Sequence, residues 1–210
     1  MRFSAFLLAA TVIPSHIPAT LAAQKQFEGI ITWGSTLAGG RGETVIHVKG
    51  VKVRMDISDA QRGAFTSIRD QNGRILMLLP PKKAFYVLGN AKTLLEPMKY
   101  EATGRKETIA GYTCEYYRVL DMHGRNPDDT ESCITTALGF AAIGPSGPMS
   151  NAEDRSIHEQ FRDGFMILKV THGGKTGVQV LKVEQTAVSD ALFAPPSDYT
   201  EIKMGGRPGW

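Results

Sequence analysis

The histidines of this 210-residue chain are the first side chains to test for metal binding or acid–base chemistry. Four of them follow the N-terminal region, at His47, His123, His158 and His172. None belongs to an HExxH motif and the two cysteines do not form CxxC, the patterns that most often supply zinc ligands. We therefore expect no metal ion and no cofactor.

Two short motifs imitate enzyme signatures without completing them. Gly174–Thr176 is similar to the end of a phosphate-binding loop, but Lys169 stands where that loop needs its leading glycine. Gly144–Gly147 holds a serine between glycines, yet its second glycine comes one residue too early for a nucleophile elbow. No nucleophile, base and oxyanion donor can be assembled, so we expect no catalytic residues and no enzymatic activity.

The first 22 residues have the layout of a secretory signal peptide. A single charge at Arg2 precedes an apolar stretch from Phe3 to Ile13, and small residues follow at Thr20–Ala22. This is the usual order of the three regions of such a leader. The apolar stretch is too short to span a bilayer as a helix. We expect an exported, soluble protein of the bacterial periplasm without an integral membrane anchor.

The two cysteines, Cys114 and Cys133, both follow the leader. In an oxidising compartment such a pair usually forms a disulfide. Closing the loop between them would stabilise the fold by about 3 kcal/mol, because the bridge lowers the entropy of the unfolded chain. We therefore expect a structural disulfide.

Composition and charge give no sign of a nucleic-acid partner. The chain is 42% hydrophobic and 21% charged, as in ordinary globular proteins. Its 24 Lys and Arg residues nearly balance 21 Asp and Glu residues, and the cations are not clustered beyond Lys82–Lys83. Nucleic-acid binding usually needs clustered cations.

The elements that must position any site are strands. Val51, Val53, Met55 and Ile57 alternate with polar residues, which predicts a strand with one buried face. An Asn-Gly pair within Gln71–Gly73 predicts a hairpin turn. Similar runs continue along the chain and indicate about nine to eleven strands.

One pair of expected strands is apolar on both faces. Between residues 74 and 79, Met77 and Leu79 alternate with Leu76 and Leu78. Strands of this kind are covered on both sides. We therefore expect chain to pack inside and outside the sheet at this place.

A 27-residue segment, Ala137–Asp163, interrupts the strand pattern. It begins apolar, continues through glycine, proline and serine, and ends in a polar segment that we expect to be helical from Asn151 to Arg162. An insertion of this length between strands is more often a lid or binding loop than filler.

Four segments resemble, in the same order, an uncharacterised family of exported bacterial proteins that share the lipoprotein-carrier (LolA-like) half-barrel. They are Lys52–Asp56, Leu79–Tyr86, Thr103–Tyr117 and Leu192–Tyr199. The resemblance covers about residues 27 to 203. It implies a mainly β (α+β) fold in which one strongly curved antiparallel sheet forms an unclosed barrel, with short helices as a lid or plug. The half-barrel domain would span residues 23–203, followed by a flexible tail at 204–210.

Members with this architecture carry acyl chains or sense lipoproteins in the cell envelope, which gives two functional hypotheses. The first is a monomeric periplasmic protein that binds a lipid or an acylated protein in an apolar interior. The residues expected to line that interior are Met55, Ile57, Met77, Leu79, Phe85, Val87, Phe140 and Phe165. In the second, the same residues fill a core, and the protein is a structural or sensory component of the envelope that binds another protein.

Overall fold

The computed structural model describes residues 24–35, 42–59, 63–90, 98–121, 123–126, 128–141, 143 and 155–203. The expected signal peptide at 1–22 and the expected tail at 204–210 lie outside the described residues, as does part of the insertion at 137–163.

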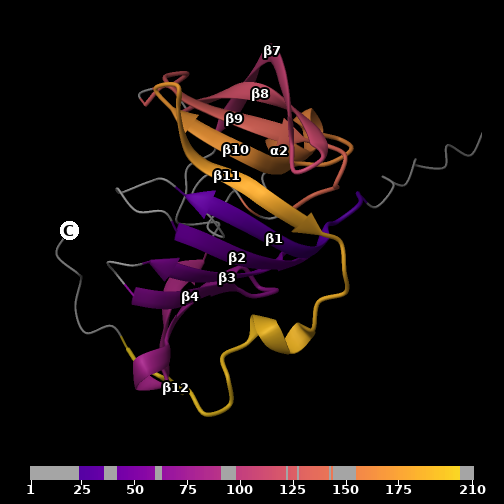
Figure 1. Ribbon diagram of the computed structural model, residues 1–210. Helices are drawn as coiled ribbons and strands as arrows, with labels where there is room; N and C mark the ends of the chain where they lie inside the picture. Colours follow the sequence, from indigo (N-terminus) through magenta and orange to yellow (C-terminus); the bar gives the residue numbers. More distant parts are fainter. Residues whose placement is uncertain are drawn as a thin grey trace, which may run out of the picture.

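Within the described residues, twelve β-strands form a single sheet (Figure 1). In chain order they are β1 (Glu28–Ser35), β2 (Gly42–Lys49), β3 (Lys52–Asp59), β4 (Gly63–Arg69), β5 (Arg74–Leu79), β6 (Ala84–Asn90), β7 (Lys99–Ile109), β8 (Tyr112–Leu120), β9 (Thr130–Thr135), β10 (Met166–His172), β11 (Lys175–Glu184) and β12 (Thr200–Glu201). Across the sheet they lie in the order β12-β6-β5-β4-β3-β2-β1-β11-β10-β9-β8-β7. Neighbours are antiparallel except β12, which is parallel to β6.

The prediction of a mainly β chain with one curved, open sheet is confirmed, with twelve strands in place of nine to eleven. The helices of the described chain are short. They are α2 (Arg155–Gln160) and the 3-10 helices η2 (Pro80–Lys82) and η3 (Asp190–Phe193). Of the helix expected at 151–162, the described part is therefore helical only at α2.

The turn between β4 and β5 explains where β4 ends and β5 begins. Gly73 has a φ of 77°, which only glycine adopts without strain. The Asp70 carboxylate accepts the backbone N–H groups of Asn72 and Arg74 at 2.8 and 3.0 Å. Beyond this turn, Arg69 pairs with Ile75 in antiparallel register. The predicted Asn-Gly turn is confirmed.

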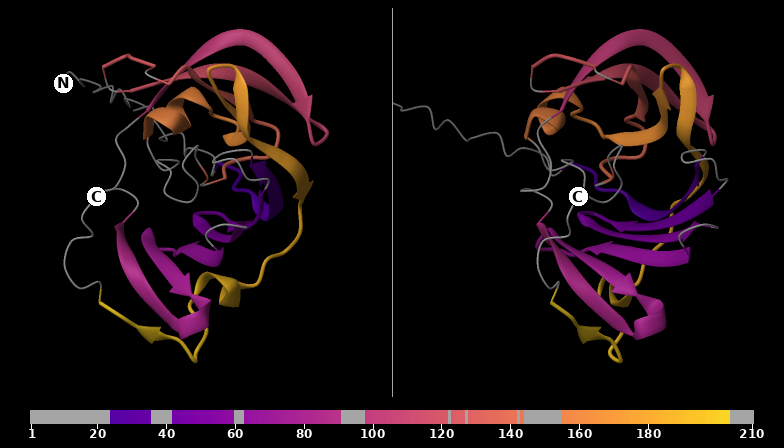
Figure 2. Two further views of the ribbon diagram at one scale, coloured as in Figure 1. Left: turned by 60° about the vertical axis from the view of Figure 1, so that its left-hand side comes forward. Right: turned by 90° about the vertical axis from the view of Figure 1, so that its left-hand side faces the viewer.

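The curvature of the sheet gives it an inner and an outer side. Figure 2 shows α2 inside the curl and the segment that follows β11 running along the outside. On the inner face of β1, β2 and β3, the cross-strand neighbours Ile31, Ile46 and Met55 are buried. They belong to one apolar cluster with Met166 and Leu168 of β10, so the interior between these strands is packed.

Candidate functional site

An apolar surface covers the inner face of the sheet from β3 to β6. It consists of Ile57, Phe65, Met77, Leu79 and Tyr86, all half-buried, and we call these five residues the inner wall. Figure 2 shows these strands on the side of the curl that faces α2 and β7–β10.

The strand register places the inner wall on the same face as the core. Met55 is opposite Ser67, Ser67 is opposite Met77, and Met77 is opposite Tyr86. One row further along, Ile57 is opposite Phe65. Since directly opposite residues in an antiparallel pair share a face, the wall continues the face that carries buried Met55.

Burial increases along the wall towards Arg69 on β4. Arg69 is only 1% exposed and is the largest of the fully buried side chains in the described chain. Its neighbours across the strands, Val53 and Ile75, are fully buried as well. The inner face therefore combines half-exposed apolar side chains at one end with a buried guanidinium at the other.

The outer face of the same strands is covered by the chain itself. Ile68, Leu76 and Leu78 pack against Val188 and Phe193, which lie in and just before η3. The expectation that chain packs on both sides of β5 is confirmed for the outer face, whereas Met77 and Leu79 on the inner face remain half-buried.

Three basic side chains hold this covering segment in place. Lys49 and Lys52 both bind the Asp190 carboxylate, Lys49 at 3.2 Å. Lys49 also donates to the Val188 carbonyl at 3.1 Å, and Arg54 donates to the Leu192 carbonyl at 3.3 Å. We call these contacts the outer clasp.

A polar cluster lies beside the outer clasp. Arg54 and Thr66 donate to the Asp56 carboxylate at 2.8 and 2.7 Å. Burial alone would raise the pKa of Asp56, but these hydrogen bonds outweigh it and the pKa lies below its ordinary value. Burial lowers the pKa of His47, whose Nε2 is 3.7 Å from Asp56, so the imidazole is neutral at pH 7. Arg54, Thr66 and Asp56 therefore satisfy one another, whereas the buried Nδ1 of His47 has no hydrogen-bond partner among the described residues.

The eight residues predicted to line an interior do not surround one space. Met55, Ile57, Met77 and Leu79 share the inner face. Phe85 and Val87 lie opposite Leu78 and Leu76 and pack with them on the outer face of the sheet. Phe140 and Phe165 belong to a separate cluster with Ile157 of α2. The prediction omitted Phe65 and Tyr86, which the register adds to the wall.

The predicted disulfide between Cys114 and Cys133 is present, with an S–S distance of 2.08 Å. It joins β8 to β9 and is buried in the inner cluster. In the described ranges, no three His, Cys, Asp or Glu side chains gather as a metal site would require. None of the helices in those ranges is long and apolar enough to cross a membrane.

The fold is similar to part of two solved structures of PNGF-II. The structures in the C2 and P21 space groups match with TM-scores of 0.50 and 0.51 at 14% and 13% identity. Each match covers 84% of this chain but only 31% or 32% of PNGF-II, so the chain spans about a third of that protein's length. At this identity the likeness concerns the fold alone. No curated protein matches the chain.

Fold and register define a domain built on one curled, open and mainly antiparallel β-sheet. The chain belongs to the family described as domain of unknown function (DUF4412), whose model matches residues 27–199. The matched range contains β1 to β11, the disulfide and the outer clasp.

Proposed function

We propose that this chain is an exported protein that binds a hydrophobic ligand, such as a lipid or the acyl chain of a lipoprotein, on the inner wall. The observation that carries the proposal is the half-exposed apolar surface of Ile57, Phe65, Met77 and Leu79 on a concave face. Removing apolar surface from water contributes about 25 cal/mol per Å², so such a wall favours an apolar occupant.

The rest of the molecule supports a restricted binding region. The interior between β1–β3 and β8–β10 is filled by fully buried side chains, such as Ile31 and Ile46. The ligand therefore lies along β3 to β6 and not through the whole curl. A buried disulfide suits an oxidising compartment, and the resemblance to lipoprotein carriers supports a periplasmic role.

A fluorescent fatty acid tests the proposal directly. The purified protein should bind it saturably, and Met77→Glu should weaken binding at least about tenfold because a carboxylate replaces an apolar contact. Leu181→Glu is the matched control, since Leu181 is 51% exposed on β11, away from the wall. Ile57→Ala provides a milder wall variant if the glutamate variant unfolds.

The packed part of the interior favours one alternative, a structural or sensory envelope protein with a filled core. In that case the protein does not bind the fluorescent fatty acid and no lipid co-purifies with it. Met77→Glu then lowers the melting temperature without changing any binding. Crosslinking in cells would then identify a protein partner.

A further inference from the structure

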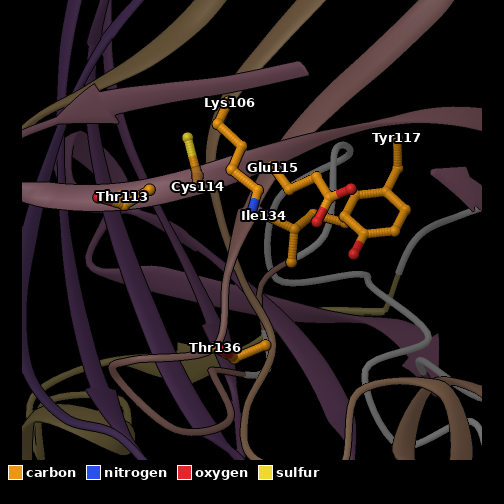
Figure 3. Close-up of a pocket in the computed structure, with 7 residues that line it drawn as sticks. All are labelled: Lys106, Thr113, Cys114, Glu115, Tyr117, Ile134 and Thr136. Atoms are coloured by element: carbon orange, nitrogen blue, oxygen red, sulfur yellow. The ribbon is translucent and has the colours of Figure 1, made fainter. Parts of the chain in front are cut away.

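A polar pocket lies between β7, β8 and β9, apart from the inner wall. Its volume is about 170 Å³. Lys106 lies opposite Glu115, which lies opposite Ile134, so these three residues form one row across the strands. Tyr117 lines the pocket two residues further along β8. Figure 3 shows Lys106, Glu115 and Tyr117 gathered at the pocket, while the Cys114 sulfur points away from it.

The charged groups of this pocket are not used by the fold. In the part of the chain that the structure describes, the side chains of Lys106 and Glu115 form no hydrogen bond and no ion pair, although they are direct cross-strand neighbours. The pair Glu101 and Arg118 on the same two strands behaves differently and forms an ion pair at 2.7 Å. The pocket therefore presents one cation and one anion that remain available to a ligand.

Tyr117 adds a fixed hydrogen-bond donor. Its ring packs against Phe161 at 5.1 Å in an edge-to-face arrangement, which orients the hydroxyl. Burial and the nearby charge of Glu115 raise the pKa of Tyr117, so the hydroxyl stays protonated at neutral pH. Thr113 and Thr136 also line the pocket.

We propose that this pocket binds a small zwitterion of amino-acid size. The ligand's ammonium group would pair with Glu115, and its carboxylate would accept from Lys106 and Tyr117. Such a ligand pairs with both charges of the pocket, whereas a neutral sugar pairs with neither. A cavity of about 150 Å³ accommodates a molecule the size of benzene, so the pocket suits a ligand of about five to ten heavy atoms.

Chemical-shift mapping on the isotope-labelled protein tests this site with glycine, alanine and serine as probes. We expect saturable shifts centred on β7, β8 and β9. Lys106→Met and Glu115→Gln should each weaken binding at least about tenfold. The matched controls Lys99→Met and Glu43→Gln change exposed residues outside the pocket and should leave binding unchanged.

Ligand fragments separate the two contacts. Propionate lacks an ammonium group, so its weaker binding should respond to Lys106→Met but not to Glu115→Gln, and ethylamine should show the reverse. Absence of saturable shifts, equal losses in the control variants, or equally strong binding of a neutral monosaccharide would each overturn the proposal. The inner-wall variant Met77→Glu should not affect these titrations, so this test is independent of the proposed lipid binding.

Discussion

At the scale of single residues, Glu107 is held by a network on β7, β8 and β10. The Tyr116 hydroxyl donates to its carboxylate, and Lys169 Nζ lies 3.1 Å from the same carboxylate. The Arg105 Cζ atom lies 3.7 Å from the centre of the Tyr116 ring. The hydrogen bond from Tyr116, with a further one from Lys169, lowers the pKa of Glu107 against the opposing effect of burial. Because its polar groups satisfy one another, the network has a structural role.

This network makes stability depend on pH in a defined window. A carboxyl whose pKa is lowered by folding stabilises the protein above its ordinary pKa of 4.5, and the effect is lost as the pH falls through the folded-state value. Since Glu107 is 38% exposed, we expect Glu107→Gln to cost less than about 1 kcal/mol at neutral pH. In urea unfolding the difference from wild type should shrink below pH 4.5. Glu43→Gln serves as the exposed control, and a difference that persists in acid would contradict the assignment.

At the scale of elements, the disulfide links β8 to β9 and joins two residues that are 19 positions apart in the sequence. We expect Cys114→Ser to lower the free energy of unfolding by about 3 kcal/mol, because the unfolded chain gains entropy. Denaturant unfolding with and without a reducing agent measures this effect. Reduction should destabilise wild type and leave the variant unchanged; equal sensitivity of both proteins would refute the explanation.

The strands that sequence patterns predicted carry a clear run of apolar residues, on one face as in β1 and β3 or on both faces as in β5. β1 alternates between buried and half-buried residues, and β3 carries the period-two run that begins at Val51. β7 was not predicted because most of its residues from 101 to 108 are exposed and polar, which removes the alternation. β12 has only two residues, which is too few for a pattern. Its pairing with β6 depends on the path of the segment that connects β11 to β12.

At the scale of the whole molecule, the segment from β11 to β12 stabilises the outer face. Phe193 is 5% exposed and packs on Ile68 and Leu78. Phe193→Ala should therefore cost about 3 kcal/mol of stability, whereas Ile202→Ala, at a site 39% exposed, should cost well under about 1 kcal/mol. Thermal unfolding compares the two variants. Limited proteolysis should also release the segment earlier in the Phe193 variant, and equal melting temperatures would show that the segment contributes little.

The sequence predicted the candidate site only where simple alternation places two residues of one strand on the same face. Period-two alternation predicts that Met55 and Ile57 share a face, and likewise Met77 and Leu79. The face taken by Phe85 and Val87 depends on the register across the turn at Pro80–Lys82, which the pattern does not contain. Bulges or irregularities in five of the strand pairings shift the register further, so long-range placement needs the folded chain.

The central pairing of β1 with β11 has a consequence for how the chain reaches its native state. Each of these strands otherwise belongs to a run of local hairpins, β1 to β6 and β7 to β11, which need only nearby partners. Among the described strands, the two runs join through the β1–β11 ladder, which pairs distant parts of the chain, and contacts of this kind form slowly. A nascent chain that has emerged only as far as β10 therefore has unpaired edges on β1 and β10, where another strand could pair until β11 arrives.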